Sequence, residues 1–189
     1  MKRRRVVLQA VGIALAGAAL PAFPQPPEPS GHKVSARQLQ EVLDRRFPLR
    51  MGVGGVLSLT LQSPVLRMLP ESNRVAADVT VLASGPALAR SSSGDFDIDF
   101  SLRYERADRT IRAHRLRVRS LRISGLQQPY PELLNGFSAA LAQQAVGELI
   151  LHRPRAEDLA LADVMGLEPD TITVTAEGLV IGFTGKQAR

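Results

Sequence analysis

The segment from Asp95 to Tyr104 alternates between polar and apolar side chains at every position. Successive side chains of a β-strand point to opposite faces of its sheet, so strict alternation indicates a strand with one buried face and one face in water. Strands of this kind are typical of antiparallel sheets. The apolar face consists of Phe96, Ile98, Phe100, Leu102 and Tyr104.

Three further segments, residues 53–62, 74–83 and 110–123, also favour strands. The first two alternate regularly. In the third, the apolar phase slips by one residue near residues 114–115 and slips again near residues 119–120. A slip of one residue turns every later side chain to the other face unless a β-bulge absorbs it. Because bulges bend and twist a strand, we expect a strongly curved sheet.

The segments 95–104 and 110–123 are suited to pair as a hairpin that turns at residues 107–108. With one bulge in the second strand, acidic and basic side chains would meet on the outer face of the sheet. Exposed pairs of this kind contribute only roughly 0.2–1 kcal/mol each, but they help to fix the register. The expected pairs are Tyr104–Ile111, Leu102–Ala113, Phe100–Leu116, Asp99–Arg117, Ile98–Val118 and Asp97–Arg119.

Two segments have the apolar spacing of helices. The first follows Ser35, a good N-cap residue, and is ended by Pro48. The second covers residues 131–151 and precedes a final strand or hairpin over 171–183 that turns at residues 177–178. The sequence therefore predicts an α+β fold in which a strongly curved antiparallel sheet wraps around the long helix of the C-terminal half, with a short N-terminal helix.

Residues 1–22 have the parts of a cleavable export signal. The basic residues Lys2–Arg5 precede the apolar stretch Val6–Leu20, and small residues follow. We expect cleavage after Ala19 or Ala22. An uncleaved anchor is the alternative, although the apolar stretch is shorter than the ~20 residues that span a bilayer.

The arginine pair Arg4–Arg5 also resembles a twin-arginine export signal, so that both this route and the general secretory route stay open. Residues 23–32 form a proline-rich leader, which we expect to be extended rather than packed. One globular domain, residues 33–185, follows.

The net charge of the chain is +6, but four of its 24 basic residues lie in the expected signal, and the remainder exceed the 18 acidic residues by only two. The chain has six Phe, two Tyr and no Trp. Such a sequence has neither the aromatic platforms nor the concentrated basic face of a nucleic-acid-binding protein, and we exclude that class. The absence of cysteine excludes disulfides, thiolate metal sites and lipid-modified cysteine.

Several short segments, taken in their order along the chain, resemble the YceB-like family of Gram-negative envelope proteins, which contain a domain of unknown function. They are Leu39–Pro48, Ser63–Pro64, Asn73–Val75 and Leu102–Tyr104, followed by the closing helix and late strand. The resemblance covers about residues 35–183. It implies a long helix cradled by a curved sheet, similar to the tubular lipid-binding superfamily.

Family members are often lipoproteins that are anchored through a cysteine after the signal. This chain has no cysteine, so the resemblance implies a soluble periplasmic form that is not a lipoprotein. The family has no established chemistry, and it therefore supplies no catalytic residues.

A curved sheet that closes incompletely on a helix can leave an apolar groove for a lipid or another hydrophobic molecule. The alternative is that the same side chains fill the core, which is the more frequent role for any one of them. The candidate lining residues are Leu57, Leu59, Leu61, Val79, Val81, Phe96, Ile98, Phe100, Phe137 and Leu141.

The strongest charge cluster of the domain could meet anionic headgroups, because guanidinium groups suit phosphate. It consists of Arg112, Arg115, Arg117, Arg119 and Arg122, and the selected candidates are Arg117 and Arg119. The alternative is that the arginines of this strand pair with Asp95, Asp97 and Asp99. These aspartates lie about 7 Å apart in succession along one strand face, which is too far for a tight cation cage.

No pattern of catalysis is present. The three histidines lie in different predicted elements, and no nucleophile elbow, phosphate loop or dinucleotide motif occurs. We expect no enzymatic activity, no metal and no cofactor; a hydrolase would need a Ser or Asp beside His114 or His152 in a cleft. The sequence thus favours a periplasmic binding module for a lipid or other hydrophobic ligand. An envelope protein-interaction or assembly factor is the alternative, and peripheral membrane contact stays open.

Overall fold

The computed structural model describes residues 31–147 and 149–185 of the chain. The predicted export signal and the part of the proline-rich leader before residue 31 lie outside the described residues. Within them, no helix is both long enough and apolar enough to cross a membrane.

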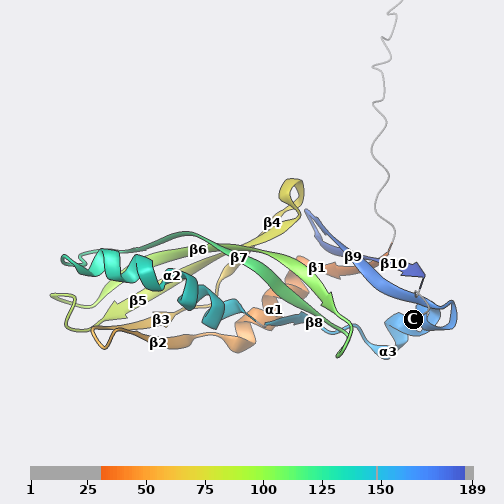
Figure 1. Cartoon of the computed structure of the whole chain (residues 1–189), viewed down its shortest axis with the longest axis horizontal. Helices are drawn as coiled ribbons and strands as arrows, with labels where there is room; N and C mark the ends of the chain where they lie inside the picture. The colour runs from red at the N-terminus through yellow and green to blue at the C-terminus, as the bar shows by residue number, and fades with distance from the viewer. Residues whose placement is uncertain (1–30, 148, 186–189) are drawn as a thin grey trace, which may run out of the picture.

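The described residues form an α+β domain whose larger sheet is an antiparallel, strongly curved half-barrel (Figure 1). Its strands run in the order β2-β3-β5-β6-β7-β8, and β4 pairs with β5 outside this path. The bounds are β2 Leu49–Val53, β3 Leu57–Leu61, β4 Val65–Leu69, β5 Arg74–Ser84, β6 Ser92–Glu105, β7 Thr110–Ile123 and β8 Ile150–His152, with a 3-10 turn at Pro70–Ser72.

The smaller sheet and three α-helices complete the described fold. The smaller sheet is antiparallel, with the order β1-β10-β9. The bounds are β1 His32–Ser35, β9 Leu167–Thr175, β10 Gly178–Gly185, α1 Ala36–Arg46, α2 Tyr130–Val146 and α3 Ala156–Val164. The predicted final hairpin is confirmed as β9–β10, but it pairs with β1 instead of joining the large sheet.

Strand β7 contains the two irregularities that the sequence predicts. The register with β6 shifts between Asp97 and Ile98 and again between Asp99 and Ser101. Four predicted pairs are confirmed, namely Tyr104–Ile111, Leu102–Ala113, Asp99–Arg117 and Ile98–Val118. The register therefore follows from the apolar phase of β7 over most of the hairpin.

Two predicted pairs in this hairpin are wrong. Asp97 pairs with Ser120 instead of Arg119, because the second bulge inserts Arg119 before that point. The predicted pairing allowed for only one bulge. Phe100 lies across from the first bulge and does not pair with Leu116.

Helix α1 begins as predicted at Ser35. The Ser35 hydroxyl accepts a hydrogen bond from the Gln38 amide, and the Gln38 side chain accepts one from the Ser35 amide, which completes a capping box. The helix ends at Arg46, just before Phe47 and Pro48. The prediction of a leader extending to residue 32 is wrong at its end, because His32 already pairs with Ile181 in β1.

Helix α2 is shorter than the predicted helix over residues 131–151. It ends at Val146, next to Gly147, and Ile150–His152 form strand β8 against β7. Glycine is a poor helix former, so the helix stops there. The apolar residues 149–151 continue the helical spacing, but a run this short fits a buried strand equally well.

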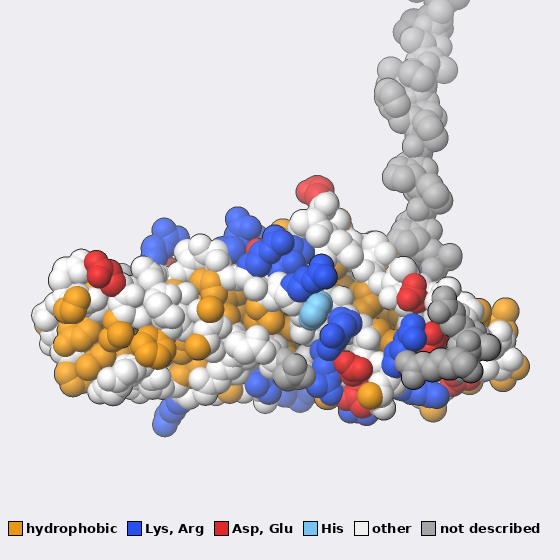
Figure 2. Space-filling view, in the orientation of Figure 1, with side chains coloured by type: hydrophobic (Ala, Val, Ile, Leu, Met, Phe, Trp, Pro, Cys, Tyr) orange, Lys and Arg blue, Asp and Glu red, His pale blue; other side chains and the backbone are white. Residues whose placement is uncertain are grey.

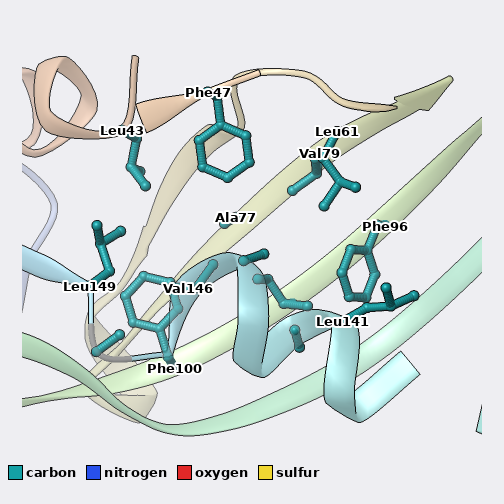
Figure 3. Packing of buried hydrophobic residues seen from close by; sticks show 14 of the residues in the cluster. Leu43, Phe47, Leu61, Ala77, Val79, Phe96, Phe100, Leu141, Val146 and Leu149 are labelled. Carbon is teal, nitrogen blue, oxygen red and sulfur yellow. The ribbon is translucent and has the colours of Figure 1, made fainter. Parts of the chain in front are cut away.

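The hydrophobic core lies between the large sheet and the helices α1 and α2. Figure 3 shows Leu43 and Phe47 from the end of α1, and Leu141 and Val146 from α2, within one cluster with sheet residues. The contacts of α2 are with β7 and with β2. Its buried residues are Leu134, Leu141, Ala142, Ala145 and Val146.

Candidate functional site

Nine of the ten predicted lining residues are buried, with exposed fractions between 0% and 4%. They belong to the hydrophobic core, as the alternative interpretation expects. The tenth, Phe137 on α2, is 41% exposed. None of the ten lines any of the four cavities that the structure describes. The nine buried residues are Leu57, Leu59, Leu61, Val79, Val81, Phe96, Ile98, Phe100 and Leu141.

One of these cavities, of about 350 Å³, lies between β7 and α2. Small and branched apolar side chains from both elements line it together with three polar residues, His114, Arg115 and Gln143. The lining residues are Ala113, His114, Arg115, Leu116 and Val118 of β7 and Ala139, Ala142 and Gln143 of α2.

The cavity coincides with the first bulge of β7. Strand β8 pairs with β7 only at Ile111 and Arg112, and beyond that point α2 packs on β7. Arg115 has a φ of 49°, a left-handed conformation that bends the strand at this point. Because Ala139 and Ala142 face the bulge with only a methyl group each, the space beside it stays open.

Arg74 of β5 reaches past β6 and hydrogen-bonds to the bulge of β7. Its Nη2 donates to the carbonyl oxygen of Arg115 at 2.6 Å and to that of Asp99 at 3.1 Å. Its Nε forms an ion pair with the Asp99 carboxylate. The side chains of Arg74 and Asp99 are only 9% and 4% exposed, so β5, β6 and the bulge of β7 meet at a buried charge pair.

The two predicted headgroup arginines have different surroundings. Arg119 lies 3.6 Å from the Asp97 carboxylate and 3.5 Å from that of Asp99, so it belongs to the acidic–basic ladder of the outer face. Arg117 alternates with Leu116 and Val118, which line the cavity, and therefore points to the other face of the sheet.

The cation that does line the cavity is Arg115, which belongs to the predicted arginine cluster but is not one of the two candidates selected from it. Within residues 31–147 and 149–185, the guanidinium groups of Arg115 and Arg117 form no hydrogen bond or ion pair. Figure 2 shows basic side chains along the stretch where Figure 1 places β7, with a histidine among them. The signal that could have identified Arg115 is the phase slip, since a residue inside a bulge leaves the alternation.

The ladder on the outer face is a network of partly exposed charges. Arg67 lies 2.5 Å from the carboxylate of Asp78 and 3.8 Å from that of Asp97. The hydrogen bond from Arg67 lowers the pKa of Asp78, whereas burial raises the pKa of Asp97. Arg67 of β4 and Arg119 of β7 thus share Asp97, and of the two predicted headgroup arginines only Arg119 pairs with aspartates as the alternative expects.

Among the described residues, His114 lies apart from the other two histidines, and His32 lies 4.0 Å from the Asp158 carboxylate. His114 is a lining residue of the cavity, and in the part of the chain that is described no serine or aspartate side chain hydrogen-bonds to its ring. His152 stacks on His32 with ring centroids 5.8 Å apart, and burial lowers the pKa of His152. Among the described residues, no group of three or more histidine, aspartate or glutamate side chains could hold a metal ion.

Comparison with protein-family models finds no match, and a search of curated proteins finds no similar chain. The resemblance to the YceB-like family therefore stays a prediction that rests on the segments quoted above.

Proposed function

We propose that this chain is a non-enzymatic binding protein of the cell envelope, exported to the periplasm, that holds an amphiphile with an apolar tail and an anionic head. The observation that carries the proposal is the cavity between α2 and β7, where apolar side chains lie beside Arg115, whose guanidinium forms no ion pair or hydrogen bond among the described residues. A lipid, or a lipid-like molecule, has this combination of parts.

The size and chemistry of the cavity support this ligand class. Its volume of about 350 Å³ falls within the roughly 300–1,000 Å³ of small-molecule sites. Leu116, Val118 and Ala142 offer an apolar surface to a hydrocarbon tail. The guanidinium of Arg115 offers the forked donors that carboxylates and phosphates prefer.

The placement of α2 supports the finer proposal that the curved sheet wraps around this helix. Strand β2 lies at one end of the strand order of the large sheet and β7 lies near the other end, yet α2 contacts both. A helix that contacts strands near both ends of a curved sheet spans its open side. The cavity beside β7 would then lie on one flank of α2, at the open side of the sheet.

Replacing Ala139 by tryptophan is expected to weaken binding of a fluorescent fatty acid about tenfold or more, because the indole would fill the cavity. Ala139 is exposed on α2, so the change leaves the core intact. Ala140→Trp is the matched control, since Ala140 is the next exposed residue of α2 and does not line the cavity. Equal affinities of the two variants, or no uptake by the parent protein, would reject the proposal.

Replacing Arg115 by glutamine is expected to weaken binding of a fatty acid by roughly tenfold, because a hydrogen bond to a charged group contributes about 1.5–3 kcal/mol. Binding of the alcohol with the same chain length should not change, since it has no anionic head. The control is Arg122→Gln, another exposed arginine of β7. Titration of both ligands against the three proteins measures the effect, and a loss of alcohol binding would contradict the role of Arg115.

The second candidate is an envelope assembly factor that binds a protein through the outer face of β7. The observation that favours it is Arg117, which is exposed and has no ion pair among the described residues. Arg119 contributes less to such a contact, because two aspartates already neutralise it.

A further inference from the structure

Three large apolar side chains are exposed on the second half of α3 and on its C-cap residue, Met165. Leu161, Val164 and Met165 are 71%, 86% and 63% exposed. Their spacing of three and four residues places them in one ridge. Leu159 and Ala162 of the same helix are buried, and the helix packs against β9. The ridge therefore points away from the molecule.

This ridge is separate from the core and from the cavity beside α2. None of its three residues belongs to the core cluster, and none lines a described cavity. Figure 1 shows α3 at the end of the elongated molecule opposite to the beginning of α2. A single exposed leucine is ordinary on a protein surface, but a contiguous apolar patch indicates contact with a partner or a membrane.

The area of the ridge argues against a second protein as its partner. Three side chains with these exposed fractions offer on the order of 400 Å², whereas a stable interface buries about 800 Å² on each partner. A lipid bilayer has no such minimum, because each apolar side chain that enters it gains separately.

Three of the carboxylates on and beside α3 form ion pairs with arginines. Arg109 lies 3.1 Å from Asp163, Arg106 lies 2.9 Å from Glu168, and Arg155 lies 3.2 Å from Glu157. With Asp158 and Asp170 of the same segment, the carboxylates outnumber these arginines, so the surroundings of the ridge do not favour an anionic surface. The three ion pairs match the paired charges of zwitterionic headgroups.

We propose that Leu161, Val164 and Met165 insert into the headgroup–acyl boundary of a lipid bilayer and dock the protein reversibly on its surface. The paired arginines remain in the headgroup layer, where their long side chains keep the charges in water. Docking does not depend on a ligand in the cavity between α2 and β7, and it goes beyond the binding function proposed above.

The test is co-flotation of the exported protein with phosphatidylcholine vesicles. The variant with Leu161→Gln, Val164→Gln and Met165→Gln is expected to lose at least about tenfold in vesicle-bound fraction, and glutamine keeps the helix propensity high. The matched control changes Val65→Gln and Leu82→Gln, which are 64% and 48% exposed on β4 and β5. This control and the cavity variant Ala139→Trp should float like the parent, so a failure of docking is distinguishable from a failure of ligand binding.

A dye attached at position 164 measures insertion into the bilayer without the triple substitution, which could prevent folding. The chain has no cysteine, so a single Val164→Cys substitution accepts one environment-sensitive dye. The dye should shift to the blue on phosphatidylcholine vesicles, while the same dye at Val65→Cys should not. An unshifted dye at position 164 overturns the proposal. Flotation that disappears in high salt, or a dimer that the triple variant abolishes, also overturns it.

Discussion

Replacing Arg74 by alanine should lower the free energy of unfolding by about 3–5 kcal/mol, because the Asp99 carboxylate would stay buried without its partner. Asp99 is 4% exposed at its side chain, and Arg119, 3.5 Å away, cannot replace the buried contact from its exposed position. The carbonyl oxygen of Arg115 would also lose its donor. Urea denaturation followed by circular dichroism measures the loss.

Arg67→Ala is the matched control for Arg74→Ala. Arg67 also forms an ion pair with an aspartate, Asp78, but its side chain is 48% exposed. Exposed pairs contribute about 0.2–1 kcal/mol, so this variant should remain close to the parent. If the two substitutions cost the same, burial of the Arg74–Asp99 pair does not determine its contribution.

The role of Arg74 could not be predicted from the sequence. In the sequence it is a polar residue at the start of a strand, which is usually a solvent-exposed position. Its partners lie 25 and 41 residues further along the chain, and one of them is a backbone carbonyl that only the bulge exposes. Side-chain alternation predicts which face a residue takes, but it does not identify contacts across three strands.

The β6–β7 hairpin could be predicted well because the local alternation of side chains determines its register. Its two strands carry long alternating patterns, and each phase slip in the sequence corresponds to a register shift in the structure. The predicted pair Asp97–Arg119 is wrong only because the predicted pairing included one bulge and left out the second phase slip. Local patterns are thus sufficient where neighbouring strands in the sequence are also neighbours in the sheet.

Helix α3 and strand β8 show where local patterns do not decide the structure. Helix α3 has apolar residues on its buried face, such as Leu159, and on its exposed face, such as Leu161, so it lacks an amphipathic stripe. Strand β8 is a three-residue apolar run that fits a helix equally well. In both, tertiary contacts select the conformation.

The same limit explains why nine of the ten predicted lining residues lie in the core. The sequence distinguishes the apolar face of each strand from the polar face, but a core residue and a lining residue share the apolar face. The cavity depends instead on small residues of α2, such as Ala139, meeting the bulge of β7. That meeting is a property of packing between residues that lie 20 or more positions apart in the sequence.

Phe100→Ala should lower the free energy of unfolding by about 3–5 kcal/mol, since truncating a buried phenylalanine leaves a cavity in the core. Phe100 is 0% exposed and belongs to the core cluster. Affinity for a fluorescent fatty acid, measured where both proteins are folded, should not change, because Phe100 does not line the cavity at α2.

Phe137→Ala is the matched control for Phe100→Ala, because both phenylalanines came from the same predicted lining and differ in burial. Phe137 is 41% exposed, so its truncation should cost about 1 kcal/mol or less. A ligand site inside the half-barrel would give a different result: Phe100→Ala would then change the affinity for the fatty acid. That outcome would move the binding site from the flank of α2 into the core and would reject the role assigned to the bulge.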